Sequence, residues 1–330
     1  MPAMFNEGFF VREPAWHGMG VVLDDYPDRA TAMRLAGHDW DIERRDLWVE
    51  GPDGLFHPVP SHTLHVRSDN GATVGVLPDT YEAIPNHVAY DVAEVLFDQG
   101  FQFETGITLE DGKSCAITLR LDQPFEVGGD DSTILPYGCL SWRHDGLGAL
   151  RARTGTIRQV CANTVNASEL EGARLGTDFT FRHTKNVMER IEDAKEAMKG
   201  IRADVDTYRR MAEELGALRV TPFQRDLFVS TIIGDPDFSV SKAPDVSARV
   251  KANIETERTK VLGLFMQDPG KSTIPEAHAL TGYGLFLAGG EYFDHLRPYQ
   301  SGTSYVRRTL LQNNPAKAAL TRTIRELVKA

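Results

Sequence analysis

The stretch that decides the fold covers residues 86–121 and reads NHVAYDVAEVLFDQGFQFETGITLEDGKSCAITLRL. Its first part predicts a helix over 86–99, because apolar residues recur at helical spacing between an asparagine cap and the stop at Gly100. Two β-rich runs follow, 101–109 and 114–121, and the Asp-Gly between them is a strong hairpin signal. The stretch therefore predicts one helix that leads into an antiparallel sheet.

The flanking sequence extends this pattern. A second pair of strands is expected at 133–142 and 149–160, and Asn-Gly at 70–71 predicts an earlier hairpin over 63–77. Residues 1–60 are rich in Gly, Pro, Trp and Asp, and residues 14–20 within them are expected to form a loop. Helices are expected at 28–36, 186–218 with a kink at Gly200, 249–266, 275–296 and 315–328, with a loop or linker over 234–248.

These elements place the chain in the α+β class, with an antiparallel sheet of about four or more strands packed with helices and a mainly helical C-terminal half. We expect a loop-rich acidic region with a hairpin at 1–85, a helix-sheet-helix core at 86–220 and a helical region at 221–330. The 330 residues, 41% of them hydrophobic, can bury a sizeable core. The chain lacks an apolar run of about 18 residues and a secretory start, which favours a cytoplasmic location.

Several kinds of chemistry lack their sequence signals. Cys115, Cys139 and Cys161 are widely spaced and form no metal-binding or redox pair, so reduced, buried thiols are expected. There is no phosphate-loop, dinucleotide-binding or serine-hydrolase motif. We therefore expect no cofactor, and a binding protein is favoured over an enzyme.

The net charge of −11 is unevenly distributed. Residues 1–100 hold 6 Arg, no Lys and 17 Asp or Glu, which accounts for the whole excess, and the other residues balance at 30 against 30. Within that balanced part, residues 141–160 hold four arginines against only Asp145, and residues 301–330 hold six Lys or Arg against only Glu326. Such asymmetry is typical of a local anion site on an acidic protein, although a solvated helix face also produces it.

The arginines of 141–160 fall within the second pair of strands. Side chains two positions apart on a strand share a face, so Arg151 and Arg153 project together. Arg143 on the preceding strand approaches them across the turn, whereas Arg158 falls on the opposite face unless Gly155 changes the register.

Two aromatic residues of the same hairpin, Trp142 and Tyr137, offer stacking surfaces. A basic sheet face with aromatic rings suits single-stranded nucleic acid, because guanidinium groups contact phosphates while bases stack on the rings. The alternative is that Trp142 lies in the core and the arginines pair with acids of residues 1–100.

The ten histidines permit a metal hypothesis. Glu291 and His295 are four residues apart and share one helical face, as two metal ligands or an ion pair would. No zinc-binding spacing is present, and a simple Glu-His pair is the commoner arrangement. A metal site would have to gather its ligands from distant segments: His17, His183, Glu291, Asp294 and His295.

Four ordered segments resemble the phage/plasmid-like proteins grouped as domain of unknown function 932. They are Trp-His-Gly-Met-Gly at 16–20, Arg-Gln-Val-Cys-Ala-Asn-Thr at 158–164, Arg-His-Thr at 182–184 and Glu-Tyr-Phe-Asp-His at 291–295. The resemblance covers nearly the whole chain and implies a bacteriophage or mobile-element protein, without supplying a reaction.

The order of helix, antiparallel strands and helix is also similar to the core of the single-strand annealing proteins of the RecT and Red-beta type. That resemblance implies a protein that binds single-stranded DNA along a basic groove, forms homo-oligomers and pairs complementary strands without ATP. A likeness of fold order supports this function only by analogy.

The leading hypothesis is thus a phage-type single-stranded DNA-binding and strand-annealing protein that acts in recombination or replication. The alternatives are a metal-dependent enzyme that uses the His/Glu/Asp set and a non-enzymatic phage factor that binds a host protein through its acidic surface. The expected DNA contacts are Arg143, Arg151 and Arg153, then Arg158, Arg182 and Lys185, with Trp142 and Tyr137 stacking on bases and Asn163 bonding a phosphate or the backbone.

Overall fold

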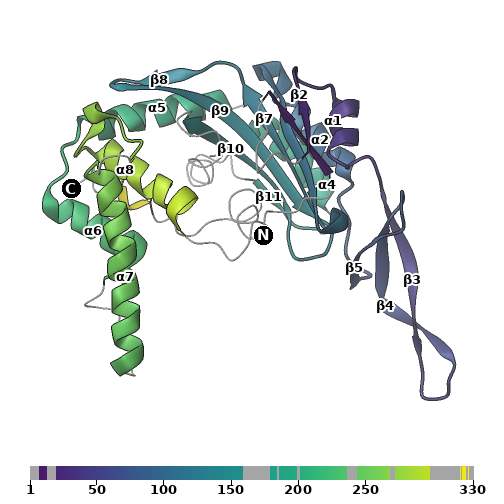
Figure 1. The fold of residues 1–330 in the computed structure, drawn as a ribbon. Coiled ribbons are helices and arrows are strands. Elements are labelled where there is room, and N and C mark those ends of the chain that lie inside the picture. Colours follow the sequence, from purple (N-terminus) through teal and green to yellow (C-terminus); the bar gives the residue numbers. More distant parts are fainter. Residues whose placement is uncertain are drawn as a thin grey trace.

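The computed structural model describes residues 7–12, 20–158, 179–183, 186–198, 201–235, 244–267 and 272–297, together with 320, 322–324 and 326. It confirms the α+β class, with sheets in the first half of the chain and helices in the second (Figure 1). Among the described residues, no helix is long and apolar enough to cross a membrane.

The larger sheet contains the two strands predicted within residues 86–121. Its strand order is β11-β10-β9-β7-β6-β1-β2, and β8 pairs with β9 outside this path. Neighbouring strands are antiparallel except for β1 and β2, which are parallel, so the sheet is mixed. The strands are β1 Glu7–Val11, β2 Val21–Leu23, β6 Phe101–Leu109, β7 Ser114–Leu121, β8 Phe125–Val127, β9 Asp130–Arg143, β10 Leu150–Arg158 and β11 Phe179–Phe181.

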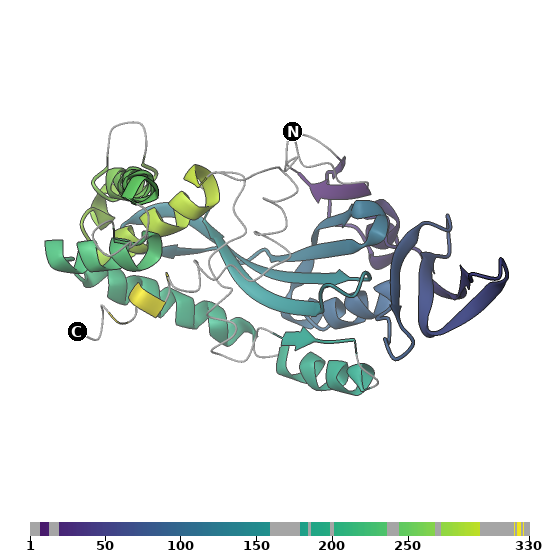
Figure 2. The same ribbon diagram turned by 90° about the horizontal axis from the view of Figure 1, so that it is seen from below.

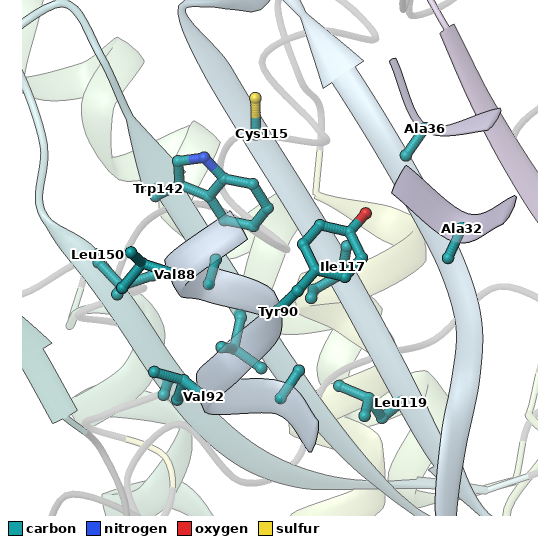
Figure 3. Packing of buried hydrophobic residues seen from close by; sticks show 14 of the residues in the cluster. Ala32, Ala36, Val88, Tyr90, Val92, Cys115, Ile117, Leu119, Trp142 and Leu150 are labelled. Carbon is teal, nitrogen blue, oxygen red and sulfur yellow. The ribbon is translucent and has the colours of Figure 1, made fainter. Parts of the chain in front are cut away.

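Helix α2, Asn86–Glu94, packs on one face of this sheet (Figure 3). Its apolar positions Val88 and Val92 lie in one buried cluster with side chains from β7, β9 and β10. The period of the helix and the alternation of the strands therefore meet in a single core, as the sequence pattern predicted. Helix α1, Arg29–Leu35, joins this core through Ala32, and its N-cap Asp28 accepts a hydrogen bond from the backbone N–H of Thr31 at 2.7 Å.

A second, three-stranded sheet extends from the body as an arm (Figures 1 and 2). It consists of β3 Ile42–Glu50, β4 Phe56–Arg67 and β5 Thr73–Pro78 in sequential antiparallel order. The hairpin predicted at Asn70-Gly71 is confirmed, and Gly71 has the positive φ of 71° that such a turn requires. Strands β1, β2, β3 and the start of β4 lie within residues 1–60, where the sequence predicted no strand.

The helical half has a separate core. Side chains from its helices and from β8 and β9 form a second buried cluster that includes Phe228 and Tyr283. The expected helix 186–218 consists of two helices, and the expected helix 275–296 is shortened to α8 with a π turn at Tyr292–Leu296. The helices are α4 Val187–Met198, α5 Ile201–Ala217, α6 Pro222–Ile233, α7 Pro244–Phe265 and α8 Gly282–Glu291.

Candidate nucleic-acid interface

The candidate interface is the sheet face that points away from α2. Arg151 pairs with Ser141 and Arg153 pairs with Cys139 across β9 and β10. The alternate residues of these strands, among them Leu140 and Ala152, belong to the core around α2. Strand alternation therefore places the arginines on the opposite side of the sheet.

Strand β7 continues the same face. Ala116 lies opposite Ser141, and Thr118 lies opposite Cys139. The centre of this face thus carries small side chains beside the two arginines of β10. This composition differs sharply from that of the other face, where large apolar side chains pack on α2.

Arg143 and Arg120 lie at the two ends of this face, and both are paired with acids. Arg143 contacts Asp145, and its Nη2 lies 3.2 Å from a carboxylate oxygen of Glu110. Burial acts to raise the pKa of the Asp145 carboxyl, but the Arg143 hydrogen bond and a backbone hydrogen bond outweigh it and lower the pKa. Arg120 lies 2.9 Å from Asp122. These two guanidinium groups are therefore largely neutralised within the chain.

The partners of Arg143 differ from those in the sequence-based alternative. That alternative placed the pairing acids within residues 1–100, whereas Glu110 and Asp145 lie beyond that region, and Asp145 is two residues from Arg143. Acids of residues 1–100 pair instead with an arginine of the same region, since Asp91 and Glu94 both contact Arg29 at 2.7 Å.

The remaining basic candidates differ in accessibility. Arg151 is half-buried, Arg153 is 4% exposed and Arg182, just after β11, is exposed. Arg158 pairs with Ile134 near the end of β10, at the alternate position to Arg151 and Arg153. Lys185 and Asn163 lie outside the described residues.

The proposed stacking role of the two aromatic residues is corrected by their burial. Trp142 has no exposed surface and lies in the core with α2 (Figure 3). Its Nε1 donates to the Oδ1 of Asn86 at 2.8 Å. Tyr137 is also buried, and that burial raises the pKa of its hydroxyl. A base can stack only on an exposed ring face, so neither residue offers a platform in this conformation.

Asn86 is the centre of a buried polar network that the sequence did not reveal. Its Nδ2 donates to the backbone carbonyls of His38 and Trp40, each at 3.1 Å, while its Oδ1 accepts from Trp142 and from His144. The sequence suggested that Asn86 caps α2, but the cap position is Pro85 and the amide is turned into the core. An asparagine at the start of a helix gives the same sequence signal whether its side chain caps the helix or enters the core. Only the tertiary contacts distinguish the two roles.

Histidines on both sides of this network are neutral. The Nε2 of His38 lies 3.0 Å from the carbonyl of Ile107, so it carries the proton, and Nδ1 accepts from the Tyr90 hydroxyl at 2.9 Å. Burial lowers the pKa of His38 to about 3. Burial also lowers the pKa of His144 to about 3, with a smaller contribution from His183. These groups tie α2 and β9 to the segment that precedes β3.

His183 takes part in a neighbouring contact. Its ring stacks on Tyr81 with centroids 4.6 Å apart, and its Nδ1 donates to the carbonyl of Glu82 at 3.0 Å. Burial lowers the pKa of His183. These contacts attach the end of β11 to the segment between β5 and α2. His183 therefore has a structural role in this part of the fold.

The metal hypothesis gains no support from the described residues. They contain no group of three or more His, Cys, Asp or Glu side chains that could hold an ion. Glu291 accepts hydrogen bonds from Thr273 instead, at 2.9 Å from the hydroxyl. His17 lies outside the described residues, and so do the side chains of Asp294 and His295.

The two cysteines that the structure describes are buried, as the sequence predicted. Among the described residues, Cys115 and Cys139 are buried and form no disulfide, and Cys161 lies outside the described residues. Burial raises the pKa of Cys115 to about 12. Because the thiolate is the reactive form, this thiol is not an activated nucleophile.

Together, the mixed sheet, the helices that pack in one core with it and the helical half define an α+β protein with an arginine-bearing sheet face. The family model described as "Domain of unknown function (DUF932)" matches residues 73–323. The match spans more than half of the chain, and the protein belongs to that family. It begins in β5, so β3 and β4 precede it. No curated protein and no solved structure matches the chain.

Proposed function

We propose that this protein binds single-stranded DNA and anneals complementary strands without ATP, as a phage-type recombination or replication factor. The observation that carries the proposal is the register of β9 and β10, which gathers Arg143, Arg151 and Arg153 on one face of the sheet. The small side chains of Ala116, Thr118 and Ser141 beside the arginines make the guanidinium groups the charged feature at the centre of that face. A backbone of phosphates is the anion that such a row suits best.

The arginines do not contribute equally in this proposal. Arg143 is already paired with two acids, which makes it an anchor of the turn between β9 and β10 rather than the first contact with DNA. Arg151 is partly accessible and Arg182 is exposed, so these two meet the strand first. Arg153 is buried, as are its neighbours Ser141 and Thr118 on the same face, so a phosphate reaches Arg153 only when this part of the face is uncovered.

The burial of Trp142 and Tyr137 changes the expected mode of binding. Without an aromatic platform in the hairpin, affinity comes mainly from phosphate contacts. Binding should then be insensitive to sequence and should weaken steeply as salt rises. This distinguishes the proposal from a protein that reads bases by stacking and hydrogen bonding.

The test is binding of a fluorescent single-stranded oligonucleotide over a salt series, followed by annealing of complementary oligonucleotides without ATP. Arg151→Ala/Arg153→Ala should weaken binding and reduce the salt slope by about 0.7 for each phosphate contact removed. Arg45→Ala is the matched control, because Arg45 is an exposed arginine on β3. Arg151→Ala alone, with near-UV circular dichroism, separates lost contacts from misfolding at the buried Arg153.

The outcomes separate the function from the site. Absence of binding by the wild-type protein at low salt would overturn the proposal. Binding with the same salt slope in the wild type and in Arg151→Ala/Arg153→Ala would show that DNA contacts another surface. Binding without annealing would reduce the function to strand protection.

A further inference from the structure

The outer end of the arm is an ordered ribbon with unusual surface chemistry. We call residues 46–58, at the turn between β3 and β4, the arm tip. The turn is held by the Asp53 carboxylate, which accepts from the Leu55 backbone N–H at 3.1 Å and bonds His57, and by Gly51 N–H donating to the Leu55 carbonyl at 2.8 Å. These bonds preorganise the tip, so that docking requires little ordering.

Large apolar side chains are exposed on this ribbon. Trp48 is 54% exposed and Phe56 is 68% exposed. Trp48 pairs with Pro58, and Glu50 pairs with Phe56, so strand alternation places both aromatic rings on one face. Val49 and Leu55 are exposed as well. A two-stranded ribbon has no core of its own, and exposed aromatic rings of this kind mark a docking surface.

The charge of the tip restricts what can dock there. Asp46, Glu50 and Asp53 are its charged residues, and the tip contains no Lys or Arg. An acidic tip repels nucleic acid, so the aromatic pair is not a base-stacking platform. The complementary surface is apolar and bordered by positive charge.

One such surface lies at the other end of the molecule, on α6. Phe223 is 75% exposed and Leu227 is 47% exposed, and their spacing of four residues places them on one helical face. Exposed Arg219 precedes the helix, whose first turn is fixed by the Thr221 capping box. We call Phe223, Leu227 and Arg219 the α6 patch.

The arm tip and the α6 patch cannot meet within one chain. Figures 1 and 2 place the arm at one end of the molecule and α6 at the opposite end, with the larger sheet between them. Contact between them requires a second copy. Such a contact is head-to-tail and leaves a free tip and a free patch at the two ends of each pair.

We infer that the arm tip of one copy docks on the α6 patch of the next, with Trp48 and Phe56 packing against Phe223 and Leu227 and the tip carboxylates facing Arg219. The apolar contact supplies the affinity, and the opposite charges select the orientation. The interface is small, so assembly should depend on protein concentration and build open chains or closed rings.

The inference goes beyond the proposed DNA binding and does not depend on it. It identifies the surface through which copies would assemble, and it is tested without DNA. The tip also precedes residue 73, where the family match begins. Failure of assembly would leave DNA binding to be judged by its own experiment, and the reverse also holds.

The experiment is sedimentation velocity over a concentration series without DNA. Wild-type protein should self-associate, whereas Trp48→Ala/Phe56→Ala and Phe223→Ala/Leu227→Ala should each raise the dissociation constant by about tenfold or more. Leu147→Ala is the matched control, because Leu147 is 81% exposed in the turn between β9 and β10 and belongs to neither surface. All the substituted side chains are exposed, so the variants should fold.

A mixing experiment tests the head-to-tail geometry directly. The tip variant keeps an intact α6 patch, and the patch variant keeps an intact tip. An equimolar mixture should therefore form a one-to-one pair that cannot extend. A wild type that stays monomeric at every concentration would overturn the inference. So would a patch variant that assembles like the wild type, since the tip would then dock elsewhere, or a mixture that forms no pair.

Discussion

Two tryptophans in antiparallel strands, Trp142 and Trp48, show that the two sheets differ in how they are stabilised. Trp142 in β9 has no exposed surface and donates a hydrogen bond to Asn86 beneath α2. Trp48 in β3 has a similar strand setting but lies more than half exposed on the arm. The larger sheet is stabilised by α1, α2 and α4, which pack in one buried cluster with its strands, whereas the outer arm has no covering element among the described residues. The first sheet is therefore complete within one chain, and the second presents a surface to a partner.

The largest effect is expected when the buried ring of Trp142 is removed, because this tests directly whether the larger sheet depends on its core. Trp142→Ala should lower the free energy of unfolding by about 3–5 kcal/mol, because it leaves a large cavity and removes the hydrogen bond to Asn86. Urea unfolding followed by circular dichroism measures the loss. A change below about 1 kcal/mol would contradict the role of Trp142 as a core residue.

The second-largest effect is expected from acid. Lowering the pH should reduce the free energy of unfolding, because the histidines buried beside the larger sheet are neutral in the folded chain. The pKa values of His38 and His144 are lowered to about 3, while an unfolded histidine titrates near 6.5. Between these values the unfolded chain binds protons that the folded chain excludes, so stability is complete above about pH 6.5 and falls as the pH decreases. At pH 5 the loss should reach at most about 2 kcal/mol for each histidine.

Urea unfolding at pH 7 and pH 5 checks this sign and magnitude. In His144→Gln, the difference between the two pH values should shrink by up to about 2 kcal/mol, because one of the buried histidines with a lowered pKa no longer titrates. A variant that loses as much stability on acidification as the wild type would show that His144 is not a source of the pH dependence.

The smallest effect is expected on the arm. Trp48→Ala should change the free energy of unfolding of the monomer by less than about 0.5 kcal/mol, because its exposed ring removes little apolar area from water on folding. The measurement is made at a protein concentration too low for assembly. A loss as large as that of Trp142→Ala would mean that the arm is part of the folding core rather than a docking element.

Much of the larger sheet could be predicted because its signals are local. The period of Val88 and Val92 predicts α2, and the alternation in β9 and β10 predicts that Arg143, Arg151 and Arg153 share a face. Strand β3 and the strands β1 and β2 were missed, since they lie in a segment rich in Gly, Pro and Asp. Their pairing with remote strands outweighs these weak local preferences.

The site was predicted less well than the fold. Alternation implied that Trp142 and Arg143 point to opposite faces, but it could not tell which face is covered. Asn86 carried the signal of a helix cap, yet it serves as the hydrogen-bonding centre beneath the sheet. His38 gave no signal, because its partners Tyr90 and Ile107 are distant in sequence.

The sequence by itself determined the local periods: which residues share a strand face, where α2 begins, and where the Asn-Gly turn falls. Only the tertiary structure decided that Trp142 is buried while Trp48 is exposed, and that Arg143 is paired while Arg182 is exposed. The physical reason is that period and turn chemistry depend on residues a few positions apart, whereas burial and charge pairing depend on what remote segments bring against each face.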